Sequence, residues 1–266
     1  MFGASGMVGC FLRPLLRGDG TTVVAISRHA RGGGTGVDWL RGTLPDDVPP
    51  LPAAEAIVSL GPLDHFVTWL EEADPAGHPR VVALSSMSAE SKRAAPLPAE
   101  RELAARLRAA ETKLAEICDQ RGLAWTVLRA TLIYDSDGGE HGFAALARRA
   151  MRWRVFPLPS GCGLRQPVHA RDLAAAVRAA LNGRADGYVL EAGGGERLSA
   201  QRMFARVRVS LPRWTMPLPV PRPVLWLAAR CSPRLRGAIA RLDQDLVADN
   251  RELEEKLGVH PGPFRP

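Results

Sequence analysis

The sequence of 266 residues predicts an α/β fold, a doubly wound parallel sheet with a smaller C-terminal lobe. Short apolar runs alternate with helix-like runs through the first half of the chain, which is typical of parallel strands covered by helices. A glycine-rich loop runs directly into an amphipathic segment near the N-terminus. After residue 213 the composition changes to proline, then tryptophan, leucine and arginine, which indicates the smaller lobe.

Strands are expected where β-branched and apolar residues form short runs. These runs are TTVVAIS (21–27), VDWLRGTL (37–44), AEAIVSLG (54–61), PRVVALSS (79–86), AWTVLRATLIY (124–134) and GYVLEAGG (187–194). Amphipathic helices are expected over 7–16, 98–122 and 173–183. The last two helices each end at a glycine, Gly122 and Gly183, as helix C-termini commonly do.

Composition is that of an ordinary globular protein, with 46% hydrophobic and 24% charged residues. We expect no signal peptide, because the N-terminus lacks a basic region followed by an apolar stretch. We expect no membrane span, because no apolar run reaches about 18 residues. The four cysteines are scattered and form no C-x-x-C pair, so we expect neither a disulfide framework nor a metal site. A reducing cytoplasm fits this cysteine usage best.

The net charge of +7 comes almost entirely from arginine. Such a charge fits nucleic acid, anionic lipid or phosphorylated substrates as partners, and it also fits a GC-rich genome without any functional cause. Nothing in the sequence is typical of a nucleic-acid-binding module. The segment 221–242 has the arginines and apolar residues for contact with a membrane surface. Because Pro233 interrupts its short apolar run, we favour a pair of helices in the lobe.

The first glycines are spaced G-x-x-G-x-x-G at Gly3, Gly6 and Gly9. The loop is followed by a helix, a turn and a strand, the order found where a helix N-terminus faces the pyrophosphate of a dinucleotide. A glycine-rich turn without a ligand is the alternative. The residues expected to bind the cofactor here are Gly3, Ser5, Gly6, Met7, Val8 and Gly9.

The end of the second expected strand bears on the choice between the two nicotinamide cofactors. NAD enzymes usually place Asp or Glu there, for the ribose hydroxyls. This chain has Ser27 followed by Arg28, with Arg31 nearby. A guanidinium can bind a 2′-phosphate through two charge-assisted hydrogen bonds, so NADP is favoured over NAD. A solvated arginine at a loop entrance is the alternative.

Seven segments taken together identify a protein family more specifically than the glycine spacing alone does. They are FGASGMVG, VVAISR, DWLRGTL, AIVSLGP, VVALSSMS, GLAWTVLRATLIY and LRQPVHARDLAAAV, and they cover roughly residues 2 to 190. In these segments the chain resembles the NAD-dependent epimerase/dehydratase group of the extended and atypical short-chain dehydrogenase/reductase superfamily. The resemblance implies one NAD(P)-binding unit over 1–266. Its Rossmann core would cover about 1–130 and 166–192, and its substrate lobe about 131–165 and 193–266.

The resemblance also implies roles for single residues. Ser86 takes the position of the catalytic serine, and Asp172 would cap the helix that follows it. Arg165 and His169 fall in the substrate-positioning segment, where Arg165 suits a diphosphate or carboxylate. For His169 and Asp172 we favour structural roles, whereas a substrate role and a structural role stay open for Arg165. Further cofactor contacts are expected from Leu60, Gly61, Pro62 and Ser85.

The catalytic pattern of the superfamily is incomplete, because the Tyr-x-x-x-Lys pair is absent. Aligned on Glu111, the Tyr and Lys positions fall at Leu103 and Leu107. One interpretation is an NADP-dependent reductase or epimerase/dehydratase with replaced catalytic groups, which include Ser86 and Lys92, acting on a nucleotide-sugar-like or other small carbonyl substrate. Another is a non-catalytic NADP(H)-binding sensor or assembly protein. A third is a scaffold that binds no cofactor.

Only Met1 and Phe2 precede the glycine loop, where the resemblance implies a complete central strand. A buried strand needs about five residues. We therefore expect a truncated first strand, explained by a start codon placed too late. A truncated chain with a damaged cofactor site is the alternative.

Overall fold

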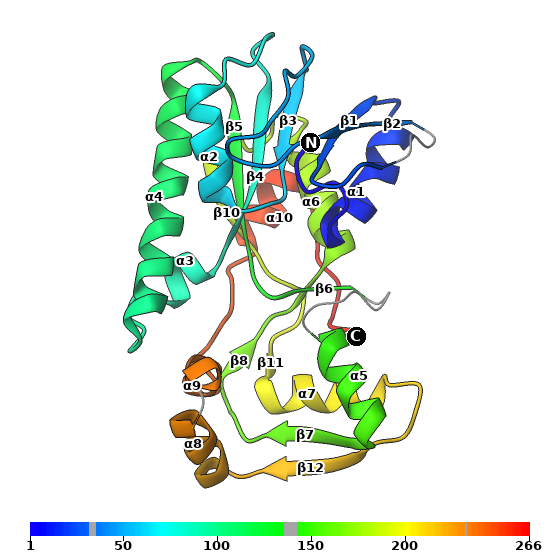
Figure 1. Ribbon diagram of the computed structural model, residues 1–266, viewed down its shortest axis with the longest axis vertical. Helices are drawn as coiled ribbons and strands as arrows, with labels where there is room; N and C mark the ends of the chain where they lie inside the picture. The colour runs from blue at the N-terminus through cyan, green and yellow to red at the C-terminus, as the bar shows by residue number, and fades with distance from the viewer. Residues whose placement is uncertain (32–35, 136–142, 232) are drawn as a thin grey trace.

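The computed structural model describes residues 1–31, 36–135, 143–231 and 233–266. Figure 1 shows a parallel sheet flanked by helices at one end of the molecule and a smaller lobe at the other. The strands of the core sheet are β1 (Val23–Ser27), β2 (Val37–Arg41), β3 (Ala56–Ser59), β4 (Arg80–Ser86), β5 (Trp125–Ala130) and β10 (Tyr188–Ala192). The expected α/β architecture is confirmed.

The sheet has a doubly wound strand order. Beginning at one edge, the order is β2, β1, the N-terminal pair Met1–Phe2, β3, β4, β5 and β10, and neighbouring strands are parallel. The chain therefore starts at the centre, builds one half outward through β2, and then crosses over to build the other half. Met1 and Phe2 occupy the position between β1 and β3.

Met1 and Phe2 fill this position through their backbone. Phe2 pairs with Ile26 of β1 on one side and Ser59 of β3 on the other. The Phe2 amide donates to the Val58 carbonyl at 2.8 Å, and the Phe2 carbonyl accepts from the Leu60 amide at 3.1 Å. The amine of Met1 is buried, which lowers its pKa to about 5. The hydrogen bonds to β1 come from Met1, whose amine donates to the Val24 carbonyl at 2.7 Å and whose carbonyl accepts from the Ile26 amide at 2.9 Å. Met1 and Phe2 together thus join the two halves of the sheet.

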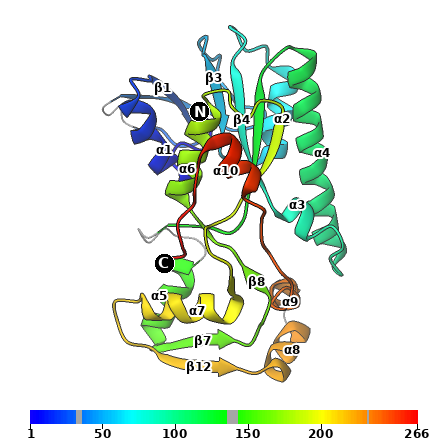
Figure 2. The same cartoon turned by 180° about the vertical axis from the view of Figure 1, so that it is seen from behind.

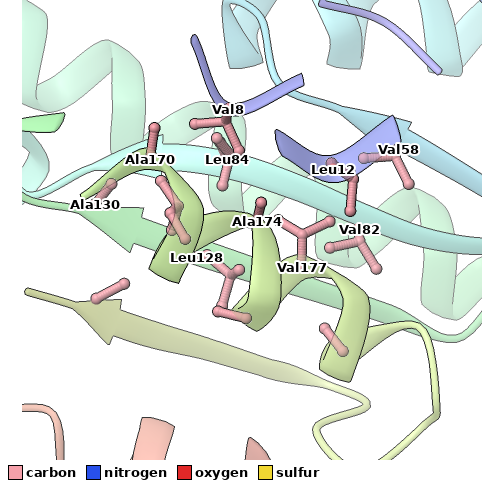
Figure 3. Close-up of a cluster of buried hydrophobic side chains, with 14 of the residues drawn as sticks. Val8, Leu12, Val58, Val82, Leu84, Leu128, Ala130, Ala170, Ala174 and Val177 are labelled. Atoms are coloured by element: carbon pink, nitrogen blue, oxygen red, sulfur yellow. The ribbon is translucent and has the colours of Figure 1, made fainter. Parts of the chain in front are cut away.

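Two helical layers cover the sheet. One consists of α1 (Met7–Gly18), α6 (Ala170–Ala180) and α10 (Arg251–Leu257), and the other of α2 (Leu63–Glu72) and α4 (Pro98–Gln120). Figure 3 shows α1 and α6 packing small and β-branched side chains onto β3, β4 and β5. The aliphatic runs of the strands are buried on both faces, as a central parallel sheet requires.

The lobe is built around a small parallel pair, β7 (Val155–Pro159) and β12 (Met216–Val220). Figure 2 shows this pair with its helices at the end of the molecule away from the core sheet. Its other elements are α5 (Phe143–Trp153), β8 (Leu164–Arg165), β11 (Leu198–Ser199), α7 (Ala200–Val209), α8 (Arg222–Cys231) and α9 (Pro233–Ala240). No helix among the described residues is long and apolar enough to cross a membrane.

The C-terminal segment differs from the expected division of the chain. Residues 193–266 were assigned to the lobe, but Leu253 and Leu257 of α10 belong to the apolar cluster beneath α1 and α6. Beyond α10, Phe264 is buried in the cluster of the lobe. The end of the chain therefore packs against the core first and the lobe second, and ties the two together.

Phe2 yields the first prediction. Its ring is 3% exposed and lies 5.7 Å from the Phe66 ring and 4.9 Å from the Trp69 ring. Phe2→Ala leaves a cavity between the sheet and α2, and should lower the free energy of unfolding by about 3–5 kcal/mol. Denaturant unfolding measures this loss. The matched control is Trp153→Ala, whose side chain is 71% exposed, with an expected change within about 0.5 kcal/mol. Equal stability of the two variants would contradict the packing role of Phe2.

Candidate cofactor-binding site

The glycine loop forms a close turn between the end of the central strand and α1. Gly3 has φ +74°, a conformation that side-chain-bearing residues rarely adopt, and a Cβ there would lie 3.1 Å from the Leu60 carbonyl carbon. The Gly6 amide donates to the Gly3 carbonyl at 2.9 Å. A Cβ on Gly9 would lie 2.5 Å from the Ala4 carbonyl oxygen. Each glycine therefore allows a close backbone approach.

Helix α1 begins at Met7 without a side-chain cap. Gly6 occupies the N-cap position and offers no side-chain acceptor to the free amides of the first turn. The first turn also contains no acidic residue. Free amides and the helix dipole make such an end a binding site for an anionic group.

A cavity of about 130 Å³ lies against this helix end. Four of its lining residues, Gly3, Gly6, Met7 and Val8, were predicted from the glycine loop, and Leu60 from the resemblance. Sequence reasoning missed Leu84 at the end of β4 and Ile133 beyond β5. Both belong to apolar runs that were assigned only to strands from the sequence. The sequence of such a run does not distinguish a residue that lines a cavity from one that is buried in the core. Glycine backbone and aliphatic walls fit a dinucleotide, which needs close approach at its phosphates and apolar contact elsewhere.

The other residues predicted to contact the cofactor belong to the loop, to α1 and to the β3–α2 connection. Ser5 is exposed in the loop, and Gly9 lies in the first turn of α1. Gly61 and Pro62 connect β3 to α2, where Pro62 occupies the N-cap position. A Cβ on Gly61 would meet nothing within 4 Å, so the backbone there borders open space. Their contacts with a cofactor stay predictions.

The end of β1 carries a group of polar and basic side chains. Ser27 is buried, and its Oγ accepts from the His29 amide at 3.3 Å and from Arg31 Nε at 3.4 Å. The guanidinium of Arg31 lies 5.2 Å from the Trp39 ring centre. Arg28 is exposed. The described residues at the end of β1 are positively charged, and β1 itself contains no carboxylate.

Ser85 and Ser86 end β4 and have different surroundings. Ser85 Oγ donates to Glu111 Oε1 at 2.5 Å, and the buried Glu111 carboxylate accepts two further hydrogen bonds from Arg129 Nε and Nη2. The hydroxyl proton of Ser85 is therefore engaged in a core ion network. Ser86 Oγ accepts from the Ser88 amide at 3.1 Å, which leaves its own proton free for donation.

Leu103 and Leu107, at the positions of the missing pair, lie half-buried on α4. The described tyrosines do not replace the missing phenol. The Tyr134 hydroxyl donates to the Pro263 carbonyl at 3.4 Å and accepts from the Arg265 amide at 3.0 Å. Burial also raises the Tyr134 pKa, which makes it a poorer acid. Tyr188 lies on edge strand β10 beneath the Lys256 ammonium.

Arg165 is buried, and its guanidinium points into main-chain carbonyls. Nη1 donates to the carbonyls of Leu164 and Gln244, and Nη2 to the carbonyl of Arg241 at 2.6 Å. Burial lowers the pKa of this guanidinium. These contacts hold the loop after α9 against β8, which favours the structural role left open above. Its predicted contact with a substrate anion stays a prediction that these contacts do not support.

His169 takes the capping role that was expected of Asp172. His169, not Asp172, caps α6, since its Nδ1 accepts from the Arg171 amide at 3.0 Å. Its ring also makes edge contacts with Phe11 and Tyr134. Asp172 Oδ2 instead accepts from the Gly262 amide at 2.9 Å. The cap prediction for Asp172 was wrong, because the C-terminal segment supplies a donor that the sequence pattern does not reveal.

Gln166 and Lys92 lie between the core and the lobe but have different surroundings. Gln166 is buried, donates to the Gly194 carbonyl at 2.8 Å and accepts from the Ala248 amide at 2.9 Å. Lys92, at the end of α3 (Ser88–Ser91), lies near Arg241, and burial together with that charge lowers its pKa. Sequence reasoning singled out Lys92 but not Gln166, which sits next to Arg165 without any distinguishing pattern.

No protein-family model matches the sequence, and no curated protein matches it either. Solved structures do match. UDP-glucose 4-epimerase from Thermotoga maritima, solved with UDP-glucose, superposes with a TM-score of 0.72 at 17% identity, over 98% of this chain and 92% of that one. dTDP-glucose 4,6-dehydratase from Bacillus anthracis, in complex with NAD, gives 0.69 at 14% identity, over 99% and 91%. WbmG from Bordetella bronchiseptica, in complex with NAD and UDP, gives 0.65 at 13% identity, over 99% and 89%. The chain therefore has the fold of nucleotide-sugar epimerases and dehydratases, core and lobe included.

The close approach at Gly9 yields a second prediction. Gly9→Ala forces a methyl group against the Ala4 carbonyl, and should destabilise the protein by about 1–3 kcal/mol while displacing the loop. The matched control is Gly18→Ala, in the same helix, where an added Cβ meets nothing within 4 Å. That variant should unfold no earlier than the parent, because alanine favours helix over glycine. Thermal melts of both variants measure the difference, and a harmless Gly9→Ala would refute the tight packing.

Proposed function

We propose that the protein binds a nicotinamide dinucleotide at the glycine loop, with the pyrophosphate at the N-terminus of α1. The observation that carries this proposal is the uncapped helix end beside Gly3 and Gly6, which faces a cavity with aliphatic walls. The amides of Met7 and Val8 would bind phosphate oxygens. Leu60, Leu84 and Ile133 would contact the apolar parts of the ligand and exclude water.

Within this proposal, NADP is the favoured cofactor. The charge at the end of β1 supports it, since Ser27 stands where a carboxylate would bind the ribose hydroxyls of NAD, and Arg28 follows it with Arg31 nearby. Four of the similar structures contain NAD, which points the other way. A carboxylate repels a 2′-phosphate, whereas a guanidinium binds it through paired hydrogen bonds, so the side chains of this chain carry more weight.

The chemistry proposed first is that of an NADP-dependent reductase or epimerase/dehydratase. The substrate class would be a nucleotide-sugar-like or other small carbonyl compound, which the fold shared with nucleotide-sugar enzymes supports. The cofactor would supply hydride transfer. Ser86 would donate a hydrogen bond from its hydroxyl to the reacting oxygen, because the Ser88 amide already orients its Oγ.

Binding without turnover is the second candidate, and a specific observation favours it. General acid chemistry needs a group whose pKa lies near the working pH. Leucines occupy the positions of the missing pair, and the Tyr134 hydroxyl is bound to the C-terminal segment with a raised pKa. A protein of this kind would sense or store the reduced cofactor.

Cofactor titration tests the binding proposal. NADPH should bind more tightly than NADH, and Arg28→Ala should weaken NADPH by about 1.5–3 kcal/mol while leaving NADH unchanged. Cofactor fluorescence gives both affinities. Arg184→Ala is the matched control, an exposed arginine between α6 and β10. Equal affinity for the two cofactors, or an Arg28→Ala variant like its control, would refute the NADP preference, and no binding of either cofactor would refute the site.

Turnover separates the two candidates. The protein is incubated with NADPH and a panel of small carbonyl compounds and nucleotide sugars, and the cofactor absorbance and the sugar products are followed. An enzyme should lose at least about tenfold in rate in Ser86→Ala, as expected for removal of a group that transfers or donates a proton. Ser91→Ala, at the end of the neighbouring α3, should keep the rate. Tight binding with no turnover of any compound would support the sensor candidate.

A further inference from the structure

The outer end of the lobe exposes large apolar side chains, which we call the lobe-tip surface. Three of its residues are tryptophans with most of their surface in solvent, Trp153 at 71%, Trp214 at 71% and Trp226 at 61%. Met216, Leu218 and Leu227 are also exposed. Soluble monomers rarely leave so many large apolar side chains in water together, and such a surface commonly marks an interaction site.

These side chains belong to one continuous part of the fold. Trp153 ends α5 and Trp214 precedes β12, and the two chain segments pair where the Met216 amide donates to the Arg154 carbonyl at 2.8 Å. Met216 and Leu218 are two residues apart in β12, so they share one face of the strand. Helix α8 follows β12 directly, and none of its residues is buried. Figures 1 and 2 both place β12 and α8 at the end of the molecule farthest from the core sheet.

The segment that carries this surface is rich in arginine, and three of its arginines, Arg206, Arg222 and Arg241, form ion pairs with carboxylates outside the segment. Residues 197–242 contain ten arginines and no aspartate or glutamate. Two guanidinium groups lie close to the exposed indoles, Arg152 at 5.6 Å from the Trp153 ring and Arg230 at 4.9 Å from the Trp226 ring. Arg213 is exposed next to Trp214. Tryptophan beside arginine is the composition that partitions to the interface of an anionic bilayer.

A second copy of the chain fits this surface poorly. Since the Met216 amide faces β7, the residues that alternate with it, Pro217 and Pro219, face the free edge of β12 and have no amide proton to donate. Strand addition by another chain is therefore blocked. Two copies that met through this surface would also bring arginines against arginines. A nucleic acid would match the charge, but the aliphatic side chains of Met216, Leu218 and Leu227 would gain nothing from phosphates.

We propose that the lobe-tip surface binds the headgroup region of an anionic lipid bilayer. The tryptophans and the aliphatic side chains enter the interface, and the arginines pair with lipid phosphates and carboxylates. The protein then lies on the membrane without crossing it. Because the lobe tip is opposite to the core sheet, the glycine loop stays on the solvent side, and the proposal holds whether or not the cofactor proposal does.

Vesicle flotation tests this proposal with the full chain. The protein should float with phosphatidylcholine vesicles that contain about 30% phosphatidylserine, and at least about tenfold less with pure phosphatidylcholine. Binding should fall steeply at about 0.5 M salt. The triple variant Trp153→Ala, Trp214→Ala, Trp226→Ala should bind at least about tenfold more weakly, and should lose the blue shift of tryptophan emission that vesicles induce in the parent.

Charge reversals supply the matched pair for this experiment. Arg213→Glu and Arg230→Glu should each weaken binding by about fivefold or more, since one basic residue at the surface contributes roughly that factor. Arg184→Glu, equally exposed on the core, should bind like the parent. Unchanged melting temperatures show that the variants are folded. The proposal fails if the parent does not float with anionic vesicles, or if the variants float like the parent. It also fails if the lobe-tip substitutions instead abolish a homodimer or the binding of a nucleic-acid duplex.

Discussion

The backbone pairing of Met1 and Phe2 joins the two halves of the core sheet and places the glycine loop. β1 and β2 form one half, β3, β4, β5 and β10 the other, and among the described residues the named strands of the two halves do not pair directly. Met1 and Phe2 lie between them, Met1 with hydrogen bonds to β1 and Phe2 with hydrogen bonds to the β3 segment, and the Phe2 ring packs against Phe66 of α2. Gly3 follows at once with φ +74°, so the turn toward α1 starts from a fixed point. The geometry of the helix end, and with it any phosphate site, depends on these two residues.

The strands of the core could be predicted because their signal is local. Runs such as VVAIS and RVVALSS are apolar on both faces, and only a central parallel strand buries such a run. Helix α4 ends before Gly122, which has φ +65° as its position suggested. The placement of α10 and the C-terminal segment could not be predicted, because Leu253 and Phe264 are buried by partners far away in the sequence. No periodicity encodes such contacts.

The same distinction separates the parts of the candidate site. The glycine loop is local, so its cavity-lining residues could be named from the spacing alone. Arg165 could not be assigned, since its guanidinium is bound by carbonyls of a loop more than 70 residues away. The cap of α6 shows a similar limit: both His169 and Asp172 can accept from free amides, and the distant Gly262 decides which of them does. When a polar side chain has several possible hydrogen-bond partners, only the tertiary structure determines which partner it binds.

The end of β4 carries two serines with different surroundings. The Ser85–Glu111–Arg129 network is buried and internally satisfied, so it fixes the strand end and holds no proton for transfer. Ser86 keeps a free proton but lacks a base beside it among the contacts described. Lys92 ends the short helix that follows, and burial with the nearby Arg241 lowers its pKa. A neutral amine costs less free energy there than in water. The β4–α3 connection therefore carries a hydroxyl donor, Ser86, and a lysine with a lowered pKa, Lys92. If the protein is an enzyme, its catalytic groups would be expected at this connection rather than on α4.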